Sequence, residues 1–142
     1  MDESSVFTRI INREVPAYIL HEDERVIVFL SLENHPLVVP KVPVRDIFSL
    51  DDDTAAAIMQ TAVRVARALK QALSCDGVYL SQANGAAAGQ DVFHFHLHLY
   101  PRWFGDGMTV RLGNYDPSDA AKAQMLGLLR AAWDDSVNQA AE

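Results

Sequence analysis

The sequence predicts a single α+β domain in which a five-stranded antiparallel sheet carries flanking helices. Short runs of branched and aromatic residues, bounded by turn-forming residues, predict four of the strands. A row of alternating histidines predicts the fifth, and one long segment with apolar residues three and four apart predicts a helix against the sheet. With 142 residues, 49% of them hydrophobic, the chain can bury one core, and nothing indicates a second domain.

The predicted strands follow one another along the chain. The first four cover residues 18–20, 26–30, 37–40 and 77–81. A charged turn around residues 22–25 joins the first two. The fifth strand begins at Val92, and we expect it to end near Tyr100 because Pro101 cannot continue a central ladder.

Two helices are predicted from the pattern of residues. The longer one opens at residues 51–54, where acidic residues favour a helix N-terminus, and its apolar stripe should face the sheet. The second helix starts at residues 116–119, with Pro117 near its first turn, and covers residues 120–133. We expect its apolar side to pack, namely Met125, Leu128, Leu129 and Trp133.

Three of the five histidines, His94, His96 and His98, occupy alternate positions in an apolar segment. Alternate residues of a strand share a face, so the three rings line one surface, opposite Phe93, Phe95, Leu97 and Leu99. Packing alone has no use for a row of titratable rings, so this face is predicted to be functional. Two chemistries fit it: a shared metal ion, or covalent catalysis by a histidine nucleophile.

A loop rich in small residues, residues 82–91, precedes the row and contains Gly85 and Gly89. Backbone N–H groups of such a loop can approach an anion closely, as they do in phosphate-binding nests. Taken alone, the loop is equally well explained as a plain hairpin connection. Beside the histidines it favours a phosphate ligand and nucleophilic catalysis.

The run from Asn84-Gly85 through Ala88-Gly89-Gln90, followed by residues 92–102, resembles the signature of the histidine triad (HIT) superfamily of nucleotide hydrolases and transferases. Residues 7–17 resemble the family's N-terminal helix and turn, and residues 35–41 its first histidine-containing strand. The resemblance covers about residues 6–104 and leaves a helical tail at residues 116–140. It implies a HIT-like sheet and a two-fold homodimer.

The resemblance also implies roles for individual residues. His96 is the expected nucleophile toward the α-phosphorus of a nucleotide, and His98 holds a phosphate oxygen. His94 and His35 orient the nucleophile and assist the leaving group. Asn84 contacts the substrate, and backbone groups near Gly89 and Gln90 stabilise the transition state. An apolar slot for the base is expected from Val6, Phe7, Ile10, Phe29 and Leu32, although Ile10 and Phe29 are equally well explained as core.

The chain departs from the family pattern at several positions. Many members hold zinc with two cysteines and two histidines, and Ser5, Thr8 and Pro43 stand at three of these positions, leaving only His94. We therefore expect no metal and no cofactor. Ser31 stands where an acidic or amide residue commonly holds the ribose, in a 31–35 segment about four residues shorter than usual. Asp91 replaces a frequent Ser or Thr near the leaving group.

Composition limits the partners and the compartment. A net charge of −7 argues against a nucleic-acid surface, and no apolar run is long enough to span a membrane. The single cysteine, Cys75, and an N-terminus without signal-peptide features predict the cytoplasm. The expected ligand is a nucleotide, with a purine of the adenosine type implied by the resemblance.

The sequence thus predicts a HIT-type hydrolase or transferase that releases a nucleoside monophosphate, similar to purine nucleoside phosphoramidases. Three alternatives remain open: a dinucleoside polyphosphate hydrolase, a metal-dependent hydrolase that uses the histidine cluster, and a nucleotide-binding protein without turnover.

Overall fold

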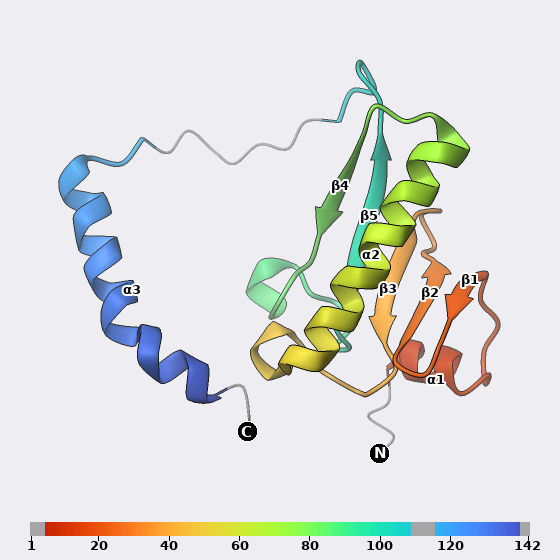
Figure 1. Ribbon diagram of the computed structural model, residues 1–142, viewed down its shortest axis with the longest axis horizontal. Coiled ribbons are helices and arrows are strands. Elements are labelled where there is room, and N and C mark those ends of the chain that lie inside the picture. The colour runs from red at the N-terminus through yellow and green to blue at the C-terminus, as the bar shows by residue number, and fades with distance from the viewer. Residues whose placement is uncertain (1–4, 109–115, 140–142) are drawn as a thin grey trace. The chain divides into compact units, whose positions relative to one another are not determined.

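The computed structural model describes residues 5–108 and 116–139, and it has the α+β fold predicted from the sequence. The five antiparallel strands lie in the order β1-β2-β3-β5-β4 (Figure 1). The strands are β1 (Ile19–Glu22), β2 (Val26–Leu30), β3 (Pro36–Pro40), β4 (Gly77–Ser81) and β5 (Leu97–Arg102). The α-helices are α1 (Val6–Ile11), α2 (Asp52–Leu73) and α3 (Asp119–Gln139), and the 3-10 helices are η1 (Ile47–Ser49) and η2 (Ala86–Ala88). No helix in these ranges is long and apolar enough to cross a membrane.

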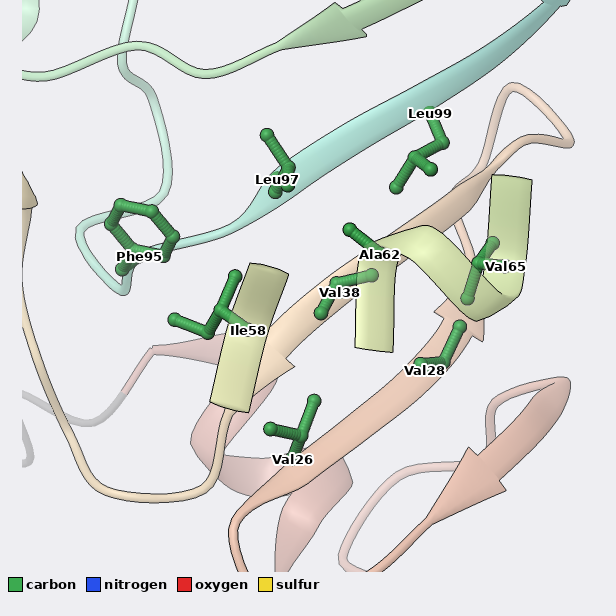
Figure 2. Packing of buried hydrophobic residues seen from close by; sticks show 9 residues of the cluster. All are labelled: Val26, Val28, Val38, Ile58, Ala62, Val65, Phe95, Leu97 and Leu99. Carbon is green, nitrogen blue, oxygen red and sulfur yellow. The ribbon is translucent and has the colours of Figure 1, made fainter. Parts of the chain in front are cut away.

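The sheet is buried on both faces, and consecutive strand residues alternate between two apolar clusters. In β2, Val26 and Val28 belong to the first cluster, whereas Ile27 and Phe29 belong to the second. The first cluster lies between the sheet and α2 and contains Val26, Val28, Val38, Ile58, Ala62, Val65, Phe95, Leu97 and Leu99 (Figure 2). The second lies between the sheet and α1 and contains Phe7, Ile10, Ile27, Phe29, Leu37 and Val39. This alternation follows from the two-residue period of a strand.

The long helix begins as its acidic residues predict. Asp51 is the N-cap, and its carboxylate accepts hydrogen bonds from the backbone N–H of Thr54 at 2.7 Å and from the Thr54 hydroxyl at 2.9 Å. Ile58, Ala62 and Val65 bury the predicted stripe against the sheet. The helix therefore supports β3 and β5, and the histidines described below lie in β5 or in the residues just before these two strands.

The fifth strand starts later than predicted, at Leu97 instead of Val92. Residues before Leu97 do not join the ladder; the N–H of Phe95 donates instead to the carbonyl of Val44, in the connection after β3, at 2.6 Å. The face opposite the histidines is expected to pack, but Phe93 on that face is half-exposed, and its ring centroid lies 4.2 Å from Cζ of the Arg45 guanidinium.

The strand also runs past its predicted end, to Arg102, and Pro101 pairs with Val78 of β4. On its other side β5 pairs with β3 only at Leu97 and His98. Pro101 therefore lies beyond the doubly paired part of β5, where a missing N–H is tolerated.

The chain divides into two compact units, one ending at Phe104 and one beginning at Gly105. In the second unit α3 is the only helix or strand among the described residues. Met125, Leu128, Leu129 and Trp133 are each more than half exposed, so the described residues of this unit do not bury the side of α3 that is expected to pack.

Candidate active site

The structure brings together four of the five histidines, on the face of the sheet that α1 covers. His35 directly precedes β3, and His98 pairs with Leu37 of that strand, so their side chains share a face. The rings of His35 and His98 have centroids 5.1 Å apart, and those of His96 and His98 are 4.9 Å apart. His21 lies on β1 and bonds Asp23 at 3.0 Å.

The His96 ring is held in one tautomer by its own main chain. Its Nδ1 lies 2.7 Å from the carbonyl oxygen of His94. A carbonyl only accepts hydrogen bonds, so Nδ1 carries the proton and donates it, and the neutral ring keeps an unprotonated Nε2. The ring is 6% exposed, so this geometry is fixed within the fold. A lone pair on Nε2 is what a nucleophilic histidine requires.

His94 has a different role, because both of its nitrogens have protein partners. Nε2 donates to the carbonyl of Pro40 at 2.7 Å, and Nδ1 lies 3.4 Å from the Thr8 hydroxyl. Burial lowers the pKa of His94; the contact with Pro40 opposes this shift, and neighbouring His96 adds to it. His94 is therefore a neutral link between α1, the end of β3 and the segment that carries His96.

His35 and His98 bond each other directly, with His35 Nε2 2.8 Å from His98 Nδ1. The other nitrogen of His35 lies 3.0 Å from the hydroxyl of Ser31. Burial, then His96 and His35, lower the pKa of His98 to about 4, although Asp91 acts in the opposite direction. Burial also lowers the pKa of His35, against the effect of Glu33. Both rings are therefore neutral near pH 7.

Tyr100 is a member of the site that the sequence prediction missed. Its ring stacks on His98 with centroids 5.6 Å apart and planes at 9°, and it lies 4.1 Å from the ring of His35. Burial raises the pKa of the Tyr100 hydroxyl, with Glu33 and Tyr79 adding to the shift. Tyr100 follows His98 by two residues, so the strand period that grouped the histidines also places it on their face.

The residues expected to form the base slot have different environments. Phe7, Ile10 and Phe29 are buried in the second cluster, where Phe7 contacts both Phe29 and His96. Leu32 is fully exposed and Val6 is 45% exposed. Within a single chain, Phe7, Ile10 and Phe29 therefore make the contacts of core residues.

The loop before the histidines is held by hydrogen bonds within itself. Gly85 and Gly89 have φ angles of 86° and 94°, a region that favours glycine. The N–H of Gly89 donates to Ala86, and the N–H of Gln90 donates to Gly85. These two N–H groups, expected to face the transition state, are therefore occupied, because η2 closes the loop on itself.

Asn84 and Gln90, both expected to bind substrate, use their side chains to anchor this loop. Asn84 exchanges two hydrogen bonds with the amide of Gln82 and accepts one from the N–H of Ile47 at 2.7 Å. Gln90 is 5% exposed; it accepts from the N–H of Gly85 at 2.7 Å. Its amide nitrogen donates to the carbonyls of Arg45 at 2.8 Å and Val92 at 3.1 Å. The geometry thus gives both amides a positioning role.

Two of the four positions where the family resemblance expects zinc ligands carry hydroxyl groups here, at Ser5 and Thr8. The Ser5 hydroxyl caps α1 by accepting from the N–H of Thr8 at 3.2 Å, and it lies 3.4 Å from the Thr8 hydroxyl, which reaches His94. Neutral hydroxyls are not structural zinc ligands, and Pro43 offers no donor side chain. In the described ranges no group of three or more His, Cys, Asp or Glu residues is arranged to hold a metal ion. The residues present do not fit a structural zinc ion.

Comparison with known proteins agrees with this arrangement. The sequence model of the HIT domain matches residues 12–105. An uncharacterized HIT-like protein of Borreliella burgdorferi is 36% identical over 115 residues, which are 77% of this chain and 83% of that protein.

Solved structures give the same result. A HIT family member from Bacillus subtilis has a TM-score of 0.84 and 27% identity and covers 91% of this chain and 96% of its own. A hypothetical histidine triad nucleotide-binding protein from Sulfolobus tokodaii has a TM-score of 0.68 and 28% identity, with 92% of each chain covered. The family model spans well over half of the sequence, and the chain belongs to the HIT family.

Proposed function

We propose that this protein is a nucleotide hydrolase or transferase that cleaves at the α-phosphate through a covalent nucleotidyl intermediate on His96. One observation carries the proposal: the hydrogen bond from His96 Nδ1 to the His94 carbonyl leaves Nε2 with a free lone pair. His98 lies beside this ring, with centroids 4.9 Å apart, and supplies a hydrogen-bonding group for the phosphate.

The reaction is a double displacement. The Nε2 lone pair of His96 forms a bond to the α-phosphorus as the bond to the leaving group breaks, and the leaving group departs with the electron pair and takes a proton from solvent. Water then attacks the phosphorus, the N–P bond breaks, and its electrons return to Nε2. The water proton is released, and a nucleoside monophosphate is the product. Each displacement is easier than a single direct one.

Main-chain donors in the segment that precedes the histidines support a phosphate ligand. Within the described part of the chain, no protein group accepts from the N–H groups of Asp91 and Val92, which follow the anchored loop. Donors fixed in place before reaction stabilise the charge that develops on phosphate oxygens. The relative from Sulfolobus tokodaii is described as nucleotide-binding, which supports a nucleotide as the ligand. A purine of the adenosine type follows only from the family resemblance.

The nitrogens of the cluster do not favour the metal-dependent alternative. His35 Nε2 and His98 Nδ1 share one hydrogen bond, and a metal ion would have to displace it. His94 Nε2 and His96 Nδ1 both donate to carbonyls and so are protonated. Exhaustive chelation should therefore leave turnover unchanged, and loss of turnover restored by added metal would support the alternative.

Trapping the intermediate tests the proposal. The protein is quenched in acid-free denaturant during turnover of an adenosine phosphoramidate, and peptide mass spectrometry locates any nucleotidyl group. We expect the adduct on His96 and none in His96→Ala, while His21→Ala serves as a matched control because His21 lies on β1 with Asp23 as its partner. An adduct on another residue, or full turnover by His96→Ala, contradicts the mechanism.

The leaving group and the assembly need separate measurements. A rate with a P–N substrate well above that with a dinucleoside polyphosphate would assign the protein as a phosphoramidase, and the reverse order would assign it as a polyphosphate hydrolase.

We also propose a two-fold homodimer, on the family resemblance alone. Light scattering during size-exclusion chromatography would give the mass of one chain if this is wrong.

A further inference from the structure

Ser31 occupies an unusual place beside the histidine cluster. It lies between β2 and β3, in a tight turn closed by a hydrogen bond from its own N–H to the carbonyl of His35 at 2.8 Å. The N–H of Asn34 donates back to the Ser31 carbonyl at 3.0 Å, and Asn34 takes a φ of 70°, which asparagine tolerates better than most residues. This short turn places the Ser31 hydroxyl 3.0 Å from His35 Nδ1.

The hydrogen bonds of Ser31 determine which way its hydroxyl points. Its Oγ accepts from the N–H of Glu33 at 3.2 Å and from the N–H of His35 at 3.3 Å. A hydroxyl oxygen has two lone pairs and one proton, so these two bonds occupy both lone pairs. The proton is left to donate to His35 Nδ1. The reverse direction would place three donors on one oxygen and leave the hydroxyl proton without an acceptor.

The donor-to-acceptor direction of the Ser31–His35 hydrogen bond determines the direction of the next one, from His35 to His98. A neutral His35 that accepts at Nδ1 carries its proton on Nε2 and donates it to His98 Nδ1 across the 2.8 Å contact. A neutral His98 that accepts at Nδ1 must carry its own proton on Nε2. Burial keeps both rings neutral near pH 7, because it lowers both pKa values.

We propose that Ser31 is a positioning residue that fixes the proton direction along Ser31, His35 and His98, so that His98 offers an Nε2–H donor to a phosphate oxygen. The inference deepens the proposed function and rests on it for the phosphate. With the opposite direction, His98 would turn a lone pair toward the oxygens and repel them. Ser31, at the position where the resemblance expects a ribose-binding residue, thus acts through His35 and His98 on phosphate binding instead.

The first test reads the ring protons directly and needs no substrate. Long-range proton–nitrogen NMR correlations of the free protein at neutral pH distinguish rings protonated at Nε2 from those protonated at Nδ1. We expect Nε2 protonation for both His35 and His98 in the wild type. In Ser31→Ala the His98 signal should change toward a mixture, and Ser31→Thr, which keeps the hydroxyl, should restore it. Ser49→Ala is the matched control, since Ser49 is an exposed residue of η1 whose backbone N–H donates to the carbonyl of Asp46, and among the described residues its hydroxyl has no bond to the histidine cluster.

The second test uses turnover. Losing a whole oxyanion donor typically costs about 10² to 10³ in kcat, and Ser31→Ala should cost about tenfold or more, because it only loosens such a donor. The effect should fall on kcat more than on KM, and Ser31→Thr should recover most of it.

Several results overturn the proposal. His98 protonated at Nδ1 in the wild type overturns it even if Ser31→Ala does not fold. Unchanged ring signals in a folded Ser31→Ala, or unchanged kcat despite changed signals, do the same. Failure of the proposed function can be told apart from failure of this inference. If only the proposed function is wrong, no His96 adduct forms, but the ring signals of the free protein are as expected.

Discussion

The rings of Phe7 and His96 meet in a T-shaped contact, with centroids 4.9 Å apart and planes at 82°. Phe7 is also part of the cluster that attaches α1 to the sheet, and its ring contacts Phe29 with centroids 5.4 Å apart. The orientation of the proposed nucleophile therefore depends on how well α1 packs. Edge-to-face contacts of this kind add to the burial of the ring itself.

Phe7→Leu should separate these two roles. Leucine keeps much of the apolar volume but not the ring contact, so we expect a fall in kcat that exceeds what the modest loss of stability explains. Phe7→Ala should also cost about 3–5 kcal/mol in the free energy of unfolding, as for other buried Phe side chains. Urea denaturation and steady-state kinetics on the same preparations give both quantities.

Ile58→Val is the control for Phe7, because Ile58 is buried on α2 in the first cluster and is not part of the expected base slot. It should cost about 0.5–1.5 kcal/mol and leave kcat unchanged. Equal kcat for Phe7→Leu and Ile58→Val would mean that the ring contact does not orient His96.

Gln90→Ala should destabilise the loop without removing any group that touches substrate. The substitution leaves the part-buried N–H of Gly85 and the carbonyls of Arg45 and Val92 without their partner. A typical hydrogen bond contributes about 0.5–1.5 kcal/mol net, so the loss of all three should lower the free energy of unfolding by about 1.5 kcal/mol or more. Gln60→Ala, on the exposed side of α2, should stay within about 0.5 kcal/mol of the wild type in urea denaturation.

Asp91→Asn tests whether charge selects the leaving group. Asp91 is exposed and raises the pKa of His98, so its carboxylate acts on the site through its field. Removing the charge should raise kcat/KM for an anionic polyphosphate relative to a phosphoramidate by up to about fivefold, since exposed charge interactions are worth about 0.2–1 kcal/mol. Glu24→Gln, an exposed carboxylate at the β1–β2 turn, should leave the ratio unchanged. A ratio that falls in Asp91→Asn counts against this role.

Acidification should weaken the fold through the buried histidines. Burial lowers the pKa of His98 from 6.5 to about 4, so between these values the unfolded chain binds more protons at this residue than the folded one. The free energy of unfolding should therefore fall as the pH drops from about 6.5 to about 4. His35 and His94 act in the same direction.

The measurement is the urea midpoint at about pH 7.5 and about pH 5. His98→Asn, which does not titrate, should show a shallower change than the wild type. Asp23, with a pKa of about 2, contributes stability that is lost only below its ordinary value of 3.8, outside this range. An identical pH dependence in His98→Asn would contradict the assignment.

Local patterns were enough to predict most of the fold. The residues of β2 and β4 match their predicted ranges, and Asp51 caps α2 where acidic residues marked its start. The alternation around the histidines also placed their rings on the face opposite Phe95 and Leu97. These features depend on the period of a strand or on one capping residue, and both can be read from neighbouring letters.

The remaining features depend on contacts between distant segments. The late start of β5 follows from the bond between Phe95 and Val44, and the positioning role of Gln90 follows from its bond to Arg45. Ser31 was predicted only as a departure from a ribose contact, because its bond to His35 exists once the turn has closed. No periodicity encodes such pairs.

The bond between His96 and the carbonyl of His94 has a consequence for how this site can change over time. The carbonyl belongs to the peptide backbone, so every residue type at position 94 supplies it. The same holds for the backbone carbonyl of Pro40, which accepts the hydrogen bond from His94 Nε2. Genetic drift can therefore alter neighbouring side chains and still preserve the protonation of the nucleophile. The hydroxyl that acts on His35 belongs to one side chain, so a single codon change abolishes it.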